Sequence, residues 1–458
     1  MRHTSLGARV LLAAVAAAIA VSVPTSAAVR PPKFEYELFT LPNGLTVVLS
    51  EDHSTPIVHV QLSYHVGSKN EKPGRTGFAH LFEHLMFKGS KNVDPEMHTS
   101  YISAVGGEVN AYTTEDETVF WATVPRQYLP LALWLEADRM ATLRIDEATF
   151  ANEREVVKEE RRLRVDNQPY GRLNEILYEN AFTVHPYRHP TIGSMADLEA
   201  ASIEDVREFH STFYVPANAT LVITGDFDPV EARRLVEQYL GRVPKAAHEV
   251  PRDIPAEPAQ TAERRITVET PWPLPAVVVA HRITYDGHPD AYPLHIAGKV
   301  LSDGQSSRIY EALVYRERIA VAAFGGANLI EDPNLFYAVA IVQPGRTTEE
   351  AADALIAELD RLKEQPITER ELERSKNQFA RDYILGRETI QQKATHLSHA
   401  VVIHGDITTA DGEFDIFQNI TTADVQRVAK TYFNENNRLV LTLMPAGAEP
   451  APASLGAR

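Results

Sequence analysis

Two stretches of the chain share one pattern of hydrophobic and polar positions. Each reads as an amphipathic helix, a short break, and then a strand rich in branched aliphatic residues. The matching residues, separated by 219 positions, are Asp205-Val206, Phe213-Tyr214, Asn218 and Leu221-Val222-Ile223 in the first stretch, and Asp424-Val425, Tyr432-Phe433, Asn437 and Val440-Leu441 in the second. This internal repeat predicts an α+β protein with two homologous lobes.

A long helix is expected over residues 146–164, because this run contains neither Gly nor Pro and is rich in strong helix formers. One side of its helical wheel carries two acids among apolar residues: Glu153 and Glu160 with Phe150, Val156, Val157 and Leu163. The opposite side carries Glu155, Lys158, Glu159 and Arg162. Carboxylates on an apolar face are costly to bury unless positive charge meets them. Either a metal ion or basic side chains from a neighbouring helix would meet that need.

The stretch His80-Leu81-Phe82-Glu83-His84 places two imidazoles and a carboxylate on one side of a helix. Two neutral imidazoles one turn apart can hold a zinc ion, and the intervening carboxylate can accept a proton from water. The order His-x-x-Glu-His is the reverse of the commoner zinc-peptidase helix. By itself the pattern is also compatible with a surface helix that carries two unrelated histidines.

A zinc site of this kind needs a third protein ligand, and the helix over residues 146–164 offers one. We expect Glu160 to be that ligand and Glu153, two turns earlier on the same face, to orient the site from beside it. Glu159 is rejected because it falls on the opposite side of the helix.

These residues resemble the inverted-motif zinc peptidases, the family that includes pitrilysin, insulin-degrading enzyme and the mitochondrial processing peptidase. The resemblance rests on Gly77-Phe78-Ala79 before the motif, on Met86-Phe87-Lys88-Gly89-Ser90 after it, and on the Glu-Arg-x-Val-Val-x-x-Glu run at 153–160. It implies lobes that are each a mostly antiparallel sheet covered by helices. It also implies one Zn²⁺ per chain, held by His80, His84 and Glu160, with Glu83 as general base and Glu153 as the supporting acid.

Residues 106–113, Gly-Gly-Glu-Val-Asn-Ala-Tyr-Thr, resemble the family's edge strand, to which an extended peptide adds itself by backbone hydrogen bonds. The resemblance implies substrate contacts at Asn110 and Ala111. Without the zinc motif, the same residues would read as a glycine-containing turn into an ordinary strand.

The second lobe has no inverted zinc motif, and its histidines His295, His396 and His399 lack partners at a suitable spacing. We therefore expect them to be structural or surface residues. In relatives that carry both functions on one chain, a segment like 313–321 presents an arginine and, seven residues later, a tyrosine that hold substrate. The corresponding positions here are Val314 and Val321.

A valine cannot donate a hydrogen bond to a developing oxyanion, so the chain alone lacks this part of the site. Arg308, Tyr315 and Arg316 lie close by and would compensate if the alignment shifted. The preferred interpretation is a heterodimer with a homologous partner chain that lacks the zinc motif and supplies the Arg/Tyr pair. A self-sufficient homodimer is the alternative.

Composition agrees with a soluble globular protein. The chain has 458 residues, 44% of them hydrophobic and 23% charged, and a formal net charge of −17. So acidic a chain is not expected to bind nucleic acid. The absence of cysteine excludes both disulfides and a thiol nucleophile.

Residues 1–28 read as a secretory signal peptide. Arg2 and Arg9 precede a hydrophobic run over residues 10–23, and Ser26-Ala27-Ala28 resembles a small-residue cleavage site. This predicts a periplasmic protein without a stable membrane anchor after cleavage. An uncleaved anchor is the alternative, whereas a mitochondrial presequence would be richer in arginine and serine.

The resulting organisation is a signal peptide (1–28), a zinc-bearing catalytic lobe (35–245), a Pro/Ala-rich linker (246–264), a homologous lobe (265–446) and a flexible tail (447–458). The expected function is zinc-dependent endopeptidase activity on unstructured peptides within a closed chamber. Two alternatives of other classes are a non-catalytic assembly subunit of the same fold and a metal-storing protein. The intact acid between the histidines argues against the first, and the lack of His-rich tracts argues against the second.

Overall fold

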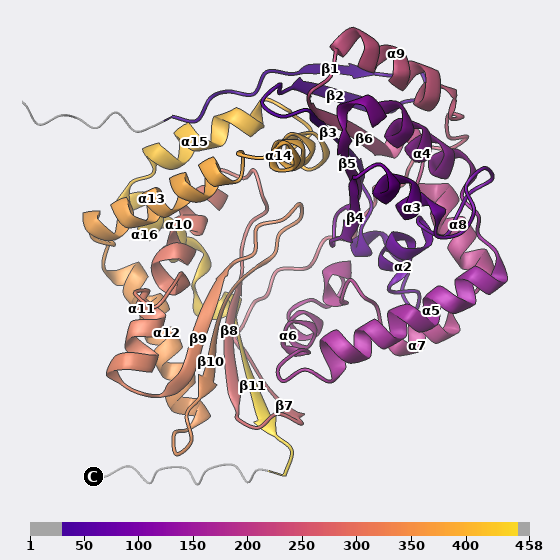
Figure 1. Cartoon of the computed structure of the whole chain (residues 1–458). Coiled ribbons are helices and arrows are strands. Elements are labelled where there is room, and N and C mark those ends of the chain that lie inside the picture. Colours follow the sequence, from indigo (N-terminus) through magenta and orange to yellow (C-terminus); the bar gives the residue numbers. More distant parts are fainter. Residues whose placement is uncertain (1–29, 448–458) are drawn as a thin grey trace, which may run out of the picture. The chain divides into compact units, whose positions relative to one another are not determined.

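The computed structural model describes residues 30–447, and the part from Phe34 onward forms one compact unit built on two sheets (Figure 1). The first sheet has strand order β1-β2-β6-β3-β5-β4. Its strands are β1 (Glu37–Thr40), β2 (Thr46–Glu51), β3 (Ile57–Tyr64), β4 (Glu108–Thr113), β5 (Thr118–Pro125) and β6 (Ala219–Gly225). The second sheet has strand order β7-β11-β8-β10-β9. Its strands are β7 (Arg264–Thr270), β8 (Ala276–Arg282), β9 (Ala320–Ala327), β10 (Leu335–Val342) and β11 (Arg438–Pro445).

The two sheets have the same topology once β1 is set aside. Strand β2 is parallel to β6 as β7 is parallel to β11, and the other pairings in both sheets are antiparallel. The expectation of an α+β protein with two homologous, mostly antiparallel lobes is therefore confirmed.

The repeat also preserves local hydrogen bonds. A capping box, Ser202 with Asp205 in the first copy and Thr421 with Asp424 in the second, begins helices α8 (Ile203–Phe213) and α16 (Thr422–Tyr432). After each helix, the side-chain amide of Asn218 or Asn437 donates to the helix's last carbonyl, at 2.8 and 2.9 Å, and to a carbonyl next to the neighbouring strand. These amides fix the angle at which each helix leads into its central strand.

Helices cover both faces of the sheets (Figure 1). In the first half of the chain they are α2 (Phe78–Leu85), α3 (Met97–Ala104), α4 (Leu129–Thr142), α5 (Glu147–Arg161), α6 (Leu173–Ala181), α7 (Met195–Ala200), α8 and α9 (Pro229–Tyr239). In the second half they are α10 (Ala291–Ser302), α11 (Arg308–Tyr310), α12 (Thr348–Glu364), α13 (Glu369–Leu385), α14 (Ile390–Val402), α15 (Thr409–Asn419) and α16.

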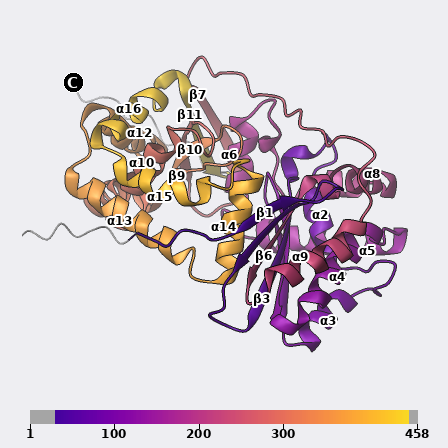
Figure 2. The ribbon, with the colours of Figure 1, turned by 90° about the horizontal axis from the view of Figure 1, so that it is seen from above.

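The two halves of the chain exchange one helix each. Helix α14, from the second half, packs on the first sheet, where Ala394 and Leu397 form a buried cluster with Val48 and Val222. Helix α6, from the first half, packs Leu177 and its neighbours on the second sheet. Figure 2, seen from above, also places α14 beside the strands of the first sheet. Because each sheet is covered partly by the other half of the chain, the lobes are tied together by apolar packing.

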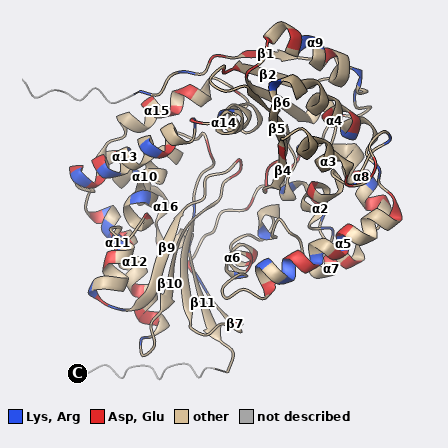
Figure 3. Cartoon of the chain, in the orientation of Figure 1, with Lys and Arg blue, Asp and Glu red and all other residues tan. Residues whose placement is uncertain are grey.

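Charged residues of both signs lie mainly along the outer helices, while the strands are mostly uncharged (Figure 3). Within residues 30–447, no helix is both long and apolar enough to cross a membrane. The predicted signal peptide at 1–28 and nearly all of the predicted tail at 447–458 lie outside the described residues.

Candidate metal centre

Helix α2 carries the His-x-x-Glu-His motif, and a buried carboxylate fixes its beginning. Glu71 accepts hydrogen bonds from the backbone N–H groups of Gly77 and Ala79, both at 2.8 Å. Burial raises the pKa of Glu71, while the hydrogen bonds from these N–H groups, which have no partner within the helix, act in the opposite direction. Gly77 itself has φ +92°, and a Cβ there would lie 2.8 Å from the carbonyl oxygen of Ile192. Only glycine fits this turn into the motif helix.

Helix α5 is the long helix expected from the sequence. Asp146 caps it by accepting from the backbone of Thr149 at 2.9 Å, and a π-helical turn over residues 162–166 ends it. Two details of the predicted apolar face are wrong. Val156 is 43% exposed, because the face that meets α2 is narrower than the wheel suggested. Leu163 is 57% exposed and lies in the π-helical turn, where the periodicity of an α-helix no longer applies. Lys158, expected on the solvent side, is buried and pairs with two glutamates.

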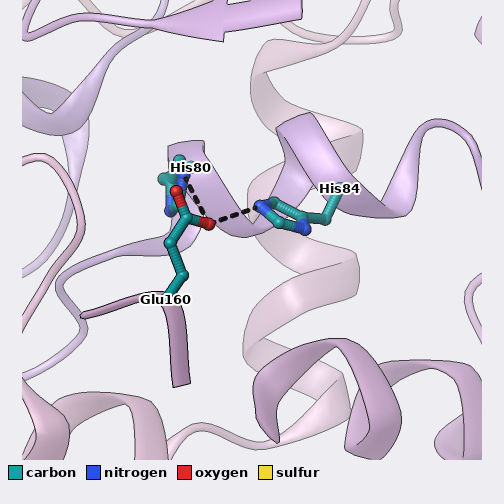
Figure 4. A group of neighbouring side chains, drawn as sticks. All are labelled: His80, His84 and Glu160. Carbon is teal, nitrogen blue, oxygen red and sulfur yellow. Dashed lines mark ion pairs between the residues drawn. The ribbon is translucent and has the colours of Figure 1, made fainter. Parts of the chain in front are cut away.

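The structure brings His80, His84 and Glu160 together (Figure 4). Glu160 Oε2 lies 3.3 Å from His84 Nε2 and 3.8 Å from His80 Nε2. Ligands of a tetrahedral zinc ion, each about 2.0 Å from the metal, stand roughly 3.3 Å from one another. Two imidazole nitrogens and a carboxylate oxygen at these separations therefore fit zinc in both chemistry and spacing.

Local contacts favour the ligating form of two of these groups. Burial, aided by the nearby His84 and Arg164, lowers the pKa of His80 to about 4 despite the opposing charge of Glu160. His80 is therefore neutral at ordinary pH, as a metal ligand must be. Arg164 binds the other carboxylate oxygen of Glu160 at 2.6 Å, which leaves Oε2 directed at the histidines.

Glu153 lies beside the site, as expected, and it is only 2% exposed. Its carboxylate accepts from Asn152 at 2.8 Å and lies 3.3 Å from Lys88 Nζ and 3.6 Å from His84 Nδ1. Burial acts to raise the pKa of Glu153, but His84, Asn152 and Lys88 together hold it below its ordinary value. The group is thus held as an anion beside the nitrogen of His84 that faces away from Glu160.

Glu83 lies on the same helix and is held from the sheet. The hydroxyl of Thr113, at the end of β4, donates to Glu83 Oε2 at 2.8 Å. Burial raises the pKa of Glu83, although Thr113 and His84 act in the opposite direction. A carboxylate with a raised pKa accepts protons more readily at neutral pH than an exposed one.

Asn110 and Ala111 face the same hollow as the motif. A cavity of about 310 Å³ is lined by Glu83, His84, Phe87, Lys88, Thr99, Val109, Asn110 and Ala111. Strand β4 pairs with β5 and is the edge of its sheet, so the position of the expected edge strand is confirmed. Three of its residues, Val109, Asn110 and Ala111, border the cavity beside the motif helix.

Four residues around the site were missed by the reasoning from sequence: Lys88, Thr113, Asn152 and Arg164. Arg164 stands four residues after Glu160, a spacing that was available as a signal. Lys88 lies beyond the end of α2 at Leu85, so no helical spacing indicates its contact with Glu153. The contact of Thr113 with Glu83 joins β4 to α2, and no local pattern indicates it.

His399 has no partner set at a suitable spacing in the sequence, but the fold brings two residues to it. Its ring lies beside His404 and the carboxylate of Asp286, which comes from another part of the chain. His295 and His396 do pack against aromatic rings, as structural histidines do.

Comparisons with known proteins define the class. Residues 46–194 match the model described as "Insulinase (Peptidase family M16)", and residues 200–379 match "Peptidase M16 inactive domain". The "Zinc protease PqqE" of Helicobacter pylori is 30% identical over 414 residues, which cover 90% of this chain and 93% of that protein. A Bacillus subtilis relative, "Uncharacterized zinc protease YmxG", is 23% identical and covers 90% of this chain and 99% of its own. These relatives place the chain among the metallopeptidases.

Solved structures agree. "The crystal structure of a protease from Helicobacter pylori" superimposes with a TM-score of 0.86 at 30% identity and covers 90% of this chain and all of that one. The first half of the periplasmic protease PqqL from Escherichia coli has a TM-score of 0.74 at 18% identity, covering 91% of this chain and 93% of that one, which shows a shared fold. The chain belongs to peptidase family M16.

Proposed function

We propose that the chain is a zinc-dependent endopeptidase whose metal is held by His80, His84 and Glu160. The observation that carries the proposal is the convergence of these three donor atoms at mutual distances that suit one zinc ion. When bound, the ion would supply Lewis acidity towards a peptide carbonyl and towards water.

In this proposal Glu83 is the general base. Thr113 orients its carboxylate towards the cavity, and burial raises its pKa, so the group is suited to accept a proton from the attacking water. Glu83 then returns that proton to the leaving amine, which completes hydrolysis with the base regenerated. Glu153 keeps His84 in its ligating orientation.

An extended peptide would add to β4 as a further strand, with Asn110 and Ala111 beside the scissile bond. The support is that β4 is an edge strand and that both residues line the cavity that contains Glu83. Binding through backbone groups favours unstructured peptides and reads side chains only weakly.

We further propose that a homologous partner chain supplies the Arg/Tyr pair. Val314 packs partly against the core of its lobe, and Val321 is 45% exposed on β9. Arg308 forms a two-pronged salt bridge with Glu371 at 2.7 and 2.9 Å, so it is engaged elsewhere. Tyr315 bonds Gln305, another contact outside the zinc site. The homodimer remains the competing arrangement, and the lobes at 35–245 and 265–446 would form the chamber wall.

A periplasmic location, reached through a signal peptide at 1–28, completes the proposal. Its support is the sequence of that segment together with the periplasmic origin stated for the Escherichia coli structural relative.

The test is Glu83→Gln, assayed for zinc content and for hydrolysis of a quenched fluorescent peptide library. Zinc content should match the wild type, whereas turnover should fall by at least about 10²- to 10⁴-fold, the usual contribution of a general base. The matched control is Glu159→Gln, because Glu159 is 57% exposed and pairs with Arg162. It should leave both readouts unchanged.

Each enzyme is measured alone and mixed with a homologous chain that lacks the zinc motif. Activity only after mixing supports the heterodimer, and activity of the chain alone supports the homodimer. Retained turnover in Glu83→Gln would refute the role of Glu83, and loss of zinc would make Glu83 structural. If the zinc-loaded wild type hydrolyses no peptide, either alone or after mixing, the result would favour the non-catalytic assembly subunit.

A further inference from the structure

A second cluster of metal-binding side chains lies far from the motif in sequence. His399 is near the end of α14, His404 follows that helix, and Asp286 follows strand β8. Asp286 Oδ2 lies 2.8 Å from His399 Nε2 and 3.2 Å from His404 Nε2. One carboxylate oxygen thus faces two imidazole nitrogens at once.

Hydrogen bonding fixes which nitrogen of His404 carries a proton. The hydroxyl of Thr409 donates its hydrogen to the carbonyl of Asp406 at 2.8 Å, so it can only accept from His404 Nδ1, 2.9 Å away. Nε2 of the same ring is directed at Asp286 Oδ2, 3.2 Å away. This nitrogen is buried and makes no hydrogen bond. A carboxylate oxygen placed between two imidazole nitrogens in this way is met either by their ring protons or by a cation that takes the place of those protons.

The geometry matches that of the first site. The rings of His399 and His404 have centroids 5.1 Å apart at an interplanar angle of 74°, and those of His80 and His84 have centroids 5.0 Å apart at 78°. In both places a carboxylate oxygen lies across from the two Nε2 atoms. His404 Nδ1 also has a hydrogen-bond partner in Thr409, and metal-bound histidines usually have a partner at the nitrogen that does not bind the metal.

The surroundings are acidic and accessible. The carboxylates of Glu117 and Glu413 also interact electrostatically with His399. A cavity of about 440 Å³, lined by His399, His404 and Glu413 among others, opens onto the two imidazoles. An ion could enter from this side, and water or Glu413 could complete its coordination.

We propose that Asp286, His399 and His404 form a second metal site, which binds a divalent transition ion of the zinc type. Two imidazoles and one carboxylate are the donors that such ions prefer, whereas Ca²⁺ and Mg²⁺ prefer oxygen alone. The chain then holds two ions rather than one.

The position of this site gives the ion a structural role. Helix α14 is anchored to the first sheet, where Ser398 donates to Ser63 at 2.7 Å and Thr224 donates to the carbonyl of Ile390 at 2.7 Å. Asp286 lies in the loop after β8 of the second sheet and is held there by its backbone bond to Ile330 at 2.8 Å. An ion shared by His399, His404 and Asp286 links the end of the helix that covers the first sheet to the loop that follows β8 in the second sheet.

The test counts zinc. The purified chain is stripped with a chelator, reloaded with zinc, freed of excess by gel filtration, and analysed by mass spectrometry for metal per chain. The wild type should hold about two ions, His84→Ala about one, and His399→Ala about one. The combination of both changes should hold none. His248→Ala is the matched control, because it removes an exposed histidine outside both clusters and should hold about two.

His399 is chosen for substitution because its side chain is 43% exposed, so its removal should disturb the fold little. Asp286→Asn is a second variant, which keeps the shape of the side chain. Near-UV circular dichroism checks that each variant is folded. Cobalt loaded into the His84→Ala variant should give visible absorption bands. These bands should be absent when His399→Ala is added to the same variant.

Absence of metal from His84→Ala would overturn the second site and leave the peptidase proposal intact. A wild type with one ion, kept in His84→Ala and lost in His399→Ala, would support the second site and contradict the first.

Discussion

Lys69 occupies the centre of an ionic cluster that joins the two lobes, and its removal gives a sharp test of what holds them together. Its side chain is 4% exposed, and its ammonium lies 3.0 Å from Asp116 of the first lobe. Two carboxylates of the second lobe, Glu331 and Asp332, lie 2.7 and 3.0 Å from the same nitrogen. A methionine at this place would keep the volume and remove the charge, so three acids would face one another across the junction.

Breaking a buried ion pair by removing one partner usually costs about 3–5 kcal/mol, because the remaining charge stays buried. We expect Lys69→Met to lower the free energy of unfolding by that amount, measured as a shift of the urea midpoint at constant slope. Lys72→Met is the control. Lys72 and its partner Glu208 are 71% and 61% exposed, so their ion pair should contribute at most about 1 kcal/mol. Equal, small effects in both variants would refute the reasoning.

Three further predictions follow from single contacts. Glu153→Gln should weaken zinc binding about 10- to 100-fold in a chelator competition, as loss of a ligand-orienting group does. Thr113→Val should lower kcat/KM by roughly 10- to 100-fold at unchanged zinc content, because the proposed base loses a hydrogen bond to a charged group worth about 1.5–3 kcal/mol. Burial raises the pKa of Asp332, but His185 and Lys69 lower it to about 2. Its stabilisation should therefore persist above about pH 4 and disappear as the pH falls towards 2, which thermal unfolding at stepped pH would reveal.

The sequence predicted the features that are encoded locally. The repeat placed the central strands β6 and β11, because helix caps, amides and apolar strand residues recur at a fixed spacing. The spacing of His80 and His84 placed both on one side of α2, and the wheel placed Glu160 on the side of α5 that meets it. The wheel overestimated the width of the buried face at Val156, since periodicity does not report how closely a neighbour approaches.

Features that depend on distant parts of the chain could not be predicted in this way. An amphipathic pattern predicts that α14 has an apolar face, but it does not predict that this face covers the sheet formed by the first half of the chain. The cluster of Asp286, His399 and His404 is also invisible in sequence, because the carboxylate is contributed from more than a hundred residues away. In each case the information lies in the packing of the lobes.

The second lobe explains why one copy of the repeat, rather than both, has the inverted motif. Helices α10 and α13 pack together in the second lobe as α2 and α5 do in the first. Asp382 of α13 stands fourteen residues after the N-cap residue of its helix, as Glu160 of α5 does. Where α2 presents histidines to its carboxylate, α10 presents Lys299, whose ammonium lies 3.0 Å from Asp382. A charge fixed to the chain thus satisfies the acid in the second lobe, whereas in the proposed function a zinc ion takes that place in the first lobe.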